Sequence, residues 1–332
     1  MITTRALITA LMVLALALAA AACGGDDDED AGGTNGAAAE NLSGRIQVDG
    51  SSTVGPFTTR AAERFQQENS GVQVTVGVSG TGGGFERFCA GETDLSNASR
   101  AIEDDEKAAC EQKGVDYVEF QVANDALTIV VNSENDWATC LTTDELKKIW
   151  EPDSQVNNWN QVRSDFPDQE LKLFGPGTDS GTFDYFTDAI NGEEGASRSD
   201  YSPSEDDNVI VQGVGGEKGG LGYFGFSYFE ENQDTLKAVE IDSGDGCVAP
   251  SSEAAQDGTY APLSRPLFVY AKTEAFARPE VEAFVQYLLD NADSIAEEVQ
   301  FVPLTDEQKQ EALSAFDAAK GGASGTETET SG

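Results

Sequence analysis

Short segments at 49–56, 79–88 and 177–186, with the sequences DGSSTVGP, SGTGGGFERF and GTDSGTFDYF, combine glycine with serine or threonine where a helix is expected to begin. The first turn of a helix has backbone N–H groups without intrahelical partners, and nearby hydroxyls can donate or accept hydrogen bonds. A small oxyanion satisfies such groups together and is favoured by the helix dipole. One segment alone would indicate only a capped helix. Several in one chain favour an oxyanion-binding site.

Arg100 and Arg198 are the candidates for a cationic contact with such an anion. Arg100 follows the small-residue run LSNAS, and Arg198 lies in GASRSDYSPS. A partly buried guanidinium forms strong charge-assisted hydrogen bonds with an oxyanion. Each arginine could instead be an ordinary surface residue, with Asp94 or Glu103 as the partner of Arg100.

Catalytic interpretations of the third segment fit the sequence poorly. The chain contains no histidine, which excludes a Ser-His-Asp hydrolase. The tetrad Asp179-Ser180-Gly181-Thr182 is also found in aspartic proteases, which need a second carboxylate, here Asp242. However, the tetrad follows GPGT rather than an apolar strand, and it runs into an amphipathic helix. We therefore predict a binding protein and not an enzyme, with no cofactor and no metal.

The charge balance excludes other partners. The chain has 20 Lys and Arg against 60 Asp and Glu, a net charge of -40. Such a surface repels nucleic acid and anionic membrane surfaces. We expect no nucleic-acid partner and a monomer that meets the membrane only through an anchor.

That anchor is predicted at the N-terminus. Residues 1–22 have one basic residue followed by an apolar run and small residues, the pattern of a secretory signal peptide. Cys23 follows Ala-Ala-Ala, a partial lipobox, and is the expected lipidation site. Residues 23–43 and 319–332 have a low-complexity composition, and we predict a disordered tether and a disordered tail. An ordinary signal peptide or an uncleaved anchor are the alternatives.

The cysteines of the mature chain, Cys89, Cys110, Cys140 and Cys247, are even in number in an exported protein, so disulfides are expected. Of the possible connectivities we favour Cys89 with Cys110, which are close in sequence, and Cys140 with Cys247. A zinc site is the weaker interpretation, because the chain has no CxxC and no histidine.

The elements that position these segments alternate between strand and helix, which predicts an α/β fold. Residues 45–48, 54–69 and 72–78 form a βαβ pattern, with Phe57, Ala61 and Phe65 on one helical face. Further helices are expected at 83–90, 104–113, after Thr142, at 182–191, 278–300 and 305–320. Further strands are expected at 115–121, 126–132, 171–174, 220–226, 236–241 and 265–271.

The chain resembles the PstS-type phosphate-binding proteins of bacterial phosphate ABC importers. The resemblance covers about 44–318 and rests on stretches that occur in the family's order. They are VDGSSTVGPF, VSGTGGGFERFCAGETDLSNASRAI, DALTIVVN, LTTDELKKIW, NWNQV, FGPGTDSGTFDYF and LGYFGFSYFEEN.

This resemblance implies a two-lobed type II periplasmic-binding-protein fold with two crossover strands and a discontinuous first lobe. Lobe I would comprise 44–129 and 266–318, and lobe II 130–265. The crossovers would lie near 127–132 and 266–271. The implied function is capture of inorganic phosphate between the lobes and its delivery to an ABC permease, at the outer face of the cell membrane.

The family's ligand-binding motifs also carry over to positions of this chain. The implied phosphate ligands are Ser52, Thr53, Thr81, Ser180, Gly181 and Thr182. To these we add Arg100, as a replacement for a cation that the family has elsewhere, and as weaker candidates Ser51, Gly82, Asp179 and Arg198. The chain departs from the family at Arg100, where many members have an aspartate. It also departs at Pro176 and Gly177, where many members have an arginine just ahead of the Ser-Gly-Thr turn. These departures leave sulfate, molybdate and arsenate open as ligands. An exported phosphate-ester hydrolase and a module without ligand are the remaining alternatives.

Overall fold

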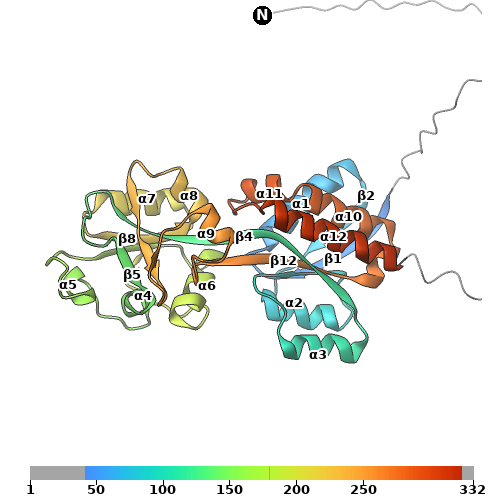
Figure 1. The fold of residues 1–332 in the computed structure, drawn as a ribbon, viewed down its shortest axis with the longest axis horizontal. Helices are drawn as coiled ribbons and strands as arrows, with labels where there is room; N and C mark the ends of the chain where they lie inside the picture. The colour runs from blue at the N-terminus through green and yellow to red at the C-terminus, as the bar shows by residue number, and fades with distance from the viewer. Residues whose placement is uncertain (1–41, 179, 324–332) are drawn as a thin grey trace, which may run out of the picture. The chain divides into compact units, whose positions relative to one another are not determined.

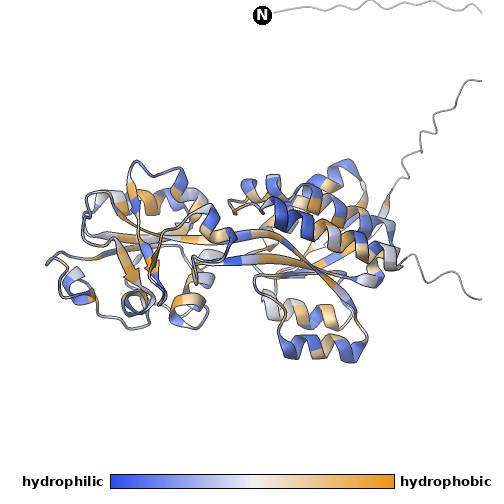
Figure 2. Ribbon diagram, viewed as in Figure 1, coloured by the Kyte–Doolittle hydropathy of each residue, from blue (hydrophilic) through white to orange (hydrophobic). Residues whose placement is uncertain are grey.

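The computed structural model describes residues 42–178 and 180–323, with the side chains of 322 and 323 left out (Figure 1). Within them the chain forms two α/β lobes, each with its own apolar core. The first core gathers side chains from 46–123 and 267–319, and the second from 127–263. Figure 2 shows the strands as largely hydrophobic and the outer faces of the helices as largely hydrophilic.

The first lobe begins with β1 (Ser43–Gly50), α1 (Gly55–Glu68) and β2 (Gly71–Val76), followed by α2 (Gly80–Cys89), β3 (Leu95–Ala98) and α3 (Asp104–Lys113). β1 pairs in parallel with β2 and β3, so the predicted βαβ unit is confirmed. The apolar face of α1 covers this sheet because Phe57, Ala61 and Phe65 are buried. The lobe is completed by η2 (Thr273–Ala277), α10 (Pro279–Asp290), α11 (Ala292–Glu298) and α12 (Asp306–Ala323).

The second lobe contains β5 (Cys140–Thr142), α4 (Thr143–Trp150), α5 (Trp159–Val162), β6 (Lys172–Gly175), α6 (Gly181–Phe186) and the π-helical turn η1 (Thr187–Asn191). It continues with β7 (Ser202–Pro203), α7 (Asp207–Gly216), β8 (Gly220–Gly225) and α8 (Phe226–Glu230). β9 (Leu236–Ala238), β10 (Glu240–Asp242), β11 (Cys247–Val248) and α9 (Ser252–Gln256) complete it. Thr142 caps α4 as predicted, because its hydroxyl accepts a hydrogen bond from the Glu145 amide.

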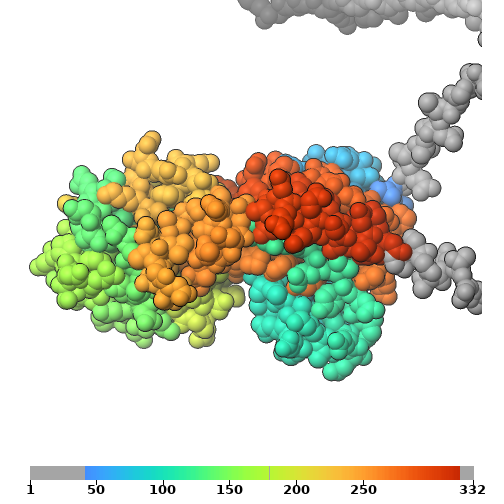
Figure 3. All heavy atoms as spheres, viewed as in Figure 1, coloured from blue at the N-terminus to red at the C-terminus, as the bar shows by residue number. Residues whose placement is uncertain are grey.

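Two long strands, β4 (Tyr117–Asn132) and β12 (Ser264–Lys272), connect the lobes. The sheet order is β2-β1-β3-β12-β4-β8-β6-β7, with β9 also paired to β4. β4 pairs with β12 along 117–126 and with β8 along 127–131, so one strand serves both lobes. Figure 3 shows a recess between the α2–α3 region of the first lobe and the yellow-green atoms of the second.

Several expected boundaries differ from the structure. The strands expected at 115–121 and 126–132 are a single strand, because the polar residues between them have backbone partners. Asn124 exchanges backbone hydrogen bonds with Val302, and Asp125 is paired with Arg265 of β12. The helix expected at 278–300 divides into α10 and α11. The helix expected at 182–191 changes to a π-helical turn after Phe186.

The strand expected at 236–241 is divided into β9 and β10, which join different sheets. At the C-terminal end, α12 continues to Ala323 although the tail was predicted to be disordered from 319, because Phe316 and Ala319 pack in the first core. Cys23 and most of the predicted tether lie outside the described residues. No helix within 42–178 and 180–323 is long and apolar enough to span a bilayer.

Candidate functional site

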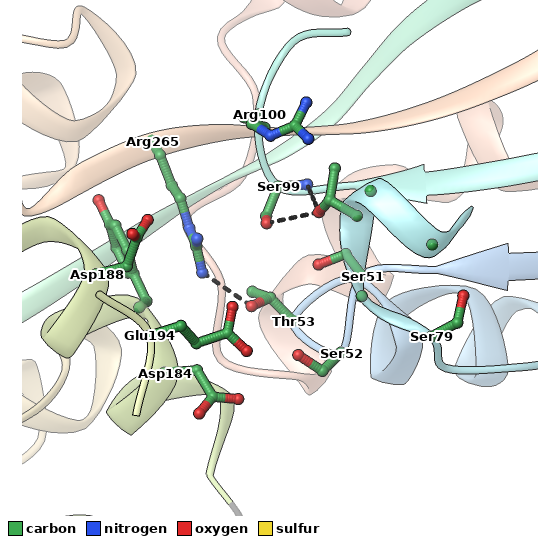
Figure 4. A pocket seen from close by; sticks show the side chains of 15 residues that line it. Ser51, Ser52, Thr53, Ser79, Ser99, Arg100, Asp184, Asp188, Glu194 and Arg265 are labelled. Atoms are coloured by element: carbon green, nitrogen blue, oxygen red, sulfur yellow. Dashed lines mark hydrogen bonds between the residues drawn. The ribbon is translucent and has the colours of Figure 1, made fainter. Parts of the chain in front are cut away.

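A cavity of about 510 Å³ lies between the two lobes (Figure 4). The first lobe lines it with the turn before α1 and with the beginning of α2. The second lobe contributes α6 and the segment after it. The lining residues are Ser51, Ser52, Thr53, Ser79, Gly80, Thr81, Gly82, Gly83, Ser99, Arg100, Asp184, Tyr185, Asp188, Glu194 and Arg265.

The turn before α1 presents hydroxyls to the cavity because its backbone is fixed from behind. The Ser51 amide donates to the Asn97 carbonyl at 2.9 Å, and the Ser51 carbonyl accepts from the Gly55 amide at 2.9 Å. Ser51 is 2% exposed, whereas Ser52 and Thr53 are half-buried at the cavity wall. The predicted residues Ser51, Ser52 and Thr53 therefore all line the cavity.

The beginning of α2 approaches the same cavity and is packed tightly against β1. A Cβ at Gly84 would lie 2.4 Å from Gly50 Cα, so only glycine permits this approach. The Thr81 hydroxyl lies 3.1 Å from the Ser99 hydroxyl and accepts from the Ser99 amide at 3.2 Å. Thr81 and Gly82, both predicted, line the cavity together with Ser99, which was not predicted.

The start of α6 faces this wall from the second lobe. The Ser180 hydroxyl caps the helix by accepting from the Thr182 amide at 3.2 Å. A Cβ at Gly181 would lie 3.5 Å from the Thr53 hydroxyl oxygen, so the α6 start and the turn before α1 lie close together. Ser180, Gly181 and Thr182 border the cavity rather than line it. Asp179 lies outside the described residues.

Arg265 on β12 points into the cavity, and it is not among the residues predicted from the sequence. Its Nη2 donates to the Thr53 hydroxyl at 2.8 Å, and Nε and Nη2 each lie 3.3 Å from the Asp125 carboxylate. Its guanidinium stacks 3.5 Å from the ring centroid of Tyr185 on α6. One guanidinium thus contacts both lobes and both crossover strands. No local motif marks Arg265, because strand register alone places it opposite Asp125.

Asp125 is buried beside this guanidinium. Burial raises the pKa of the Asp125 carboxyl, and the charge and hydrogen bonds of Arg265 lower it. Burial has the larger effect, as expected for a carboxyl removed from water. Arg265 therefore presents a positive charge to the cavity, and the Asp125 carboxyl on its other side offsets part of that charge.

The predicted cation Arg100 also lines the cavity, but acidic residues already occupy its donors. Nη1 and Nη2 each lie 2.8 Å from a carboxylate oxygen of Glu106, and Nε lies 3.2 Å from Glu103. These carboxylates raise the Arg100 pKa. In Figure 4 the Arg265 side chain extends toward Thr53, whereas the Arg100 guanidinium lies beyond Ser99.

The weaker candidate Arg198 is placed elsewhere, and its prediction as a ligand is corrected by the structure. It is 6% exposed and does not line the cavity between the lobes. Its Nη1 donates to the carbonyls of Ile149 and Val156, and its Nε and Nη2 bind Asp200. These contacts fasten the loop after α6 to the core of the second lobe.

The second lobe adds carboxylates to the wall opposite the hydroxyls. They belong to Asp184, Asp188 and Glu194. The pKa of Asp184 is raised by burial and by the charge of Glu194, and lowered by Arg265. The cavity therefore has a wall of amides and hydroxyls, one inward cation, and an acidic wall across from them.

Both predicted disulfides are confirmed. Cys89 is bonded to Cys110, which joins α2 to α3, and Cys140 is bonded to Cys247, which joins β5 to β11. Glu240 lies near the second pair in an arrangement that could ligate a metal. Since those sulfur atoms form a disulfide, they offer no thiolate to a metal.

Comparisons with known proteins agree with this architecture. The model of the PBP superfamily domain matches residues 35–292. The Protein SphX of Synechococcus elongatus is 50% identical over 262 residues, covering 78% of this chain and 77% of that protein. The phosphate-binding protein PstS of Staphylococcus saprophyticus is 38% identical over 288 residues, covering 86% and 88%.

Among solved structures, that of a possible phosphate binding protein from Planctomyces limnophilus is 48% identical, with a TM-score of 0.82 over 84% of this chain and 99% of that one. These likenesses extend across both lobes and both crossover strands. They confirm the predicted fold and family, and they agree with a binding protein rather than an enzyme. The chain belongs to the PstS family of the PBP superfamily.

Proposed function

We propose that this protein binds inorganic phosphate in the cavity between its lobes and delivers it to an ABC permease. The observation that carries the proposal is the convergence of the beginnings of α1, α2 and α6 with Arg265. Amides at helix beginnings, hydroxyls and a guanidinium are the groups that bind a tetrahedral oxyanion. The names of the PstS relative and the Planctomyces structure support phosphate as that anion.

The proposed ligand set joins predicted residues with one found in the structure. Ser52, Thr53 and Thr81 supply hydroxyls or amides from the first lobe, and Arg265 supplies the charge. The start of α6, at 180–182, closes over the anion from the second lobe, because Gly181 already lies close to Thr53. The net charge of -40 does not prevent binding, since distant surface charges are screened by salt and local donors are not.

The cellular setting belongs to the same proposal. Residues 1–22 act as a signal peptide, and a lipid on Cys23 holds the mature monomer at the outer face of the membrane. Labelling with a radioactive fatty acid tests this: the wild type becomes labelled, whereas Cys23→Ser does not. A labelled Cys23→Ser variant would contradict lipidation at this residue.

Calorimetry on protein stripped of bound ligand tests the ligand directly. Phosphate binds the wild type with a stoichiometry of about one, as expected for a single cavity. Thr53→Val and Thr81→Val each weaken binding by about 5- to 30-fold through loss of a hydrogen bond in a desolvated site. Thr75→Val on the exposed face of β2 is the matched control and leaves binding unchanged.

Titrations with sulfate, arsenate and molybdate decide among oxyanions, and tighter binding of one of them would replace phosphate in the proposal. The absence of heat with every oxyanion would contradict a binding role. Turnover of an aryl phosphate, with or without divalent metals, would instead favour the hydrolase alternative.

A further inference from the structure

The segment 97–102, here called the Arg100 loop, leads from β3 to α3 and lines the cavity with Ser99 and Arg100. It is fastened at both ends by side chains from other elements. The side-chain Nδ2 of Asn97 donates to the Thr58 hydroxyl at 2.8 Å, and the backbone N–H of Ile102 donates to the Tyr270 hydroxyl at 3.0 Å. These bonds fix the ends of the loop, and the contacts of Arg100 fix the residues between them.

Arg100 holds the middle through the first turn of α3. The Glu106 carboxylate accepts a hydrogen bond from each Nη atom of Arg100 at 2.8 Å. It also accepts one from the backbone N–H of Glu103, as part of the capping box of α3. The Glu106 side chain is only 15% exposed, so this contact is better shielded than an ordinary surface ion pair. A bidentate arginine–carboxylate pair also fixes orientation.

The Arg100 loop and α3 also contact α2, whose first turn lines the cavity beside Ser99 and Arg100. The Cys89–Cys110 disulfide joins α2 to α3, and both cysteines are buried. The Arg100 guanidinium also lies 5.9 Å from the ring centroid of Phe85 on α2. Ser99, next to Arg100, meets Thr81 of α2 through two hydrogen bonds. The Arg100 loop, α2 and α3 are therefore joined to one another by a disulfide, an ion pair and hydrogen bonds.

We propose that Arg100 is a positioning residue rather than a ligand: through Glu106 it fixes the Arg100 loop so that the Ser99 and Thr81 hydroxyls stay directed at the anion. This inference rests on the proposed function. Arg265 carries the positive charge toward the ligand, and Arg100 supplies rigidity. A preformed wall binds more tightly because less side-chain freedom is lost on binding.

Glu106→Ala separates the two roles because they predict opposite signs. If Arg100 is a positioning residue, Glu106→Ala weakens phosphate binding by about 5- to 30-fold, Arg100→Ala does the same, and the double variant is no weaker than either single variant. If Arg100 is a ligand, Glu106→Ala frees its guanidinium and leaves binding unchanged or tighter. That result would overturn the inference.

Further variants separate orientation from charge and from folding. Arg100→Lys keeps the charge but loses the bidentate contact, so it behaves like Arg100→Ala if the residue positions the loop. Recovery of wild-type affinity in Arg100→Lys would contradict the inference. Asp104→Ala removes an exposed ion pair with Lys107 from the same helix and serves as the matched control, with affinity unchanged.

Amide hydrogen exchange supplies a readout that a ligand role would not move. In the absence of phosphate, Arg100→Ala and Glu106→Ala both speed exchange in 97–102 relative to the Asp104→Ala control, whereas unchanged exchange would overturn the inference. If the wild type binds no oxyanion, the proposed function fails, and the role of Arg100 toward a ligand fails with it. If the wild type binds phosphate and Glu106→Ala binds it as tightly, only the inference fails.

Discussion

Replacement of Arg265 by glutamine tests how much of the binding energy comes from the inward cation. The Arg265 side chain is 17% exposed and contacts Thr53, Asp125 and Tyr185, so a bound anion would meet it largely shielded from water. Unit charges about 4 Å apart interact by about 4 kcal/mol at an effective dielectric constant of about 20. Part of this is offset by desolvation, which leaves an expected loss of about 2–4 kcal/mol.

That loss corresponds to phosphate binding weakened by about 30- to 700-fold. Calorimetry measures it on protein stripped of ligand, and chemical denaturation of the same samples measures stability. Arg265→Gln also leaves the Asp125 carboxyl buried without its cation, which costs about 3–5 kcal/mol of unfolding free energy if the carboxyl stays ionised. The double variant with Asp125→Asn removes that acid, so it regains stability but not affinity.

Glu145→Gln is the matched control. Glu145 pairs with Arg163 in the second lobe, away from the cavity, and its neutralisation leaves phosphate affinity unchanged. Binding by Arg265→Gln within two-fold of the wild type would refute the assignment of Arg265 as the cation of the site. Recovery of affinity in the double variant would show instead that the single variant acts through misfolding.

Three further predictions concern charge, pH and covalent links. Because the net charge is -40, the association rate of phosphate measured by stopped flow rises with added salt, and a rate that falls would contradict a repulsive approach. Burial and neighbouring acids raise the pKa of Asp207 to about 6. The folded state therefore retains a proton that the unfolded state loses above pH ~4, and stability falls as pH rises from about 4 to about 6. Asp207→Asn removes this cost. A rise in pKa from about 4 to about 6 corresponds to about 3 kcal/mol, and solvent screening of the partly buried side chain reduces this, so denaturation finds the variant about 1–2 kcal/mol more stable at pH ~7 and equally stable at pH ~4. Equal stability of variant and wild type at both pH values would refute the shift. Removal of Cys140–Cys247, which spans 107 residues, lowers the unfolding free energy by about 5 kcal/mol, against about 3 kcal/mol for Cys89–Cys110, which spans 21; the reverse order would contradict a chain-entropy origin.

Much of the fold was predictable because its signals are local. Apolar alternation marked β1 and β2, and Phe57, Ala61 and Phe65 marked the buried face of α1. The serine and threonine turns before α1 and α2 were also local signals, and they meet in one cavity. Hydroxyls and glycines at helix starts can be recognised without knowledge of the tertiary structure.

The missed features depend on contacts between distant parts of the chain. Arg265 reaches the cavity only because β12 pairs with β4 in a register that places it opposite Asp125. The sequence offered Glu103 as a partner of Arg100, and Nε of Arg100 does lie 3.2 Å from Glu103. No local pattern marked Glu106, which accepts hydrogen bonds from both Nη atoms. Arg198 lies in a polar segment typical of a binding loop, but its guanidinium donates hydrogen bonds to buried backbone carbonyls of the second lobe. Such pairings are set by tertiary packing, which a local motif does not encode.

A crystal structure of the protein grown with saturating phosphate would locate the anion. We expect tetrahedral density between the lobes, within hydrogen-bonding distance of Thr53, Thr81 and the Arg265 guanidinium, with the backbone N–H groups of 181 and 182 donating from the start of α6. A cavity that holds only water under these conditions, or an anion bound at another surface, would contradict this expectation.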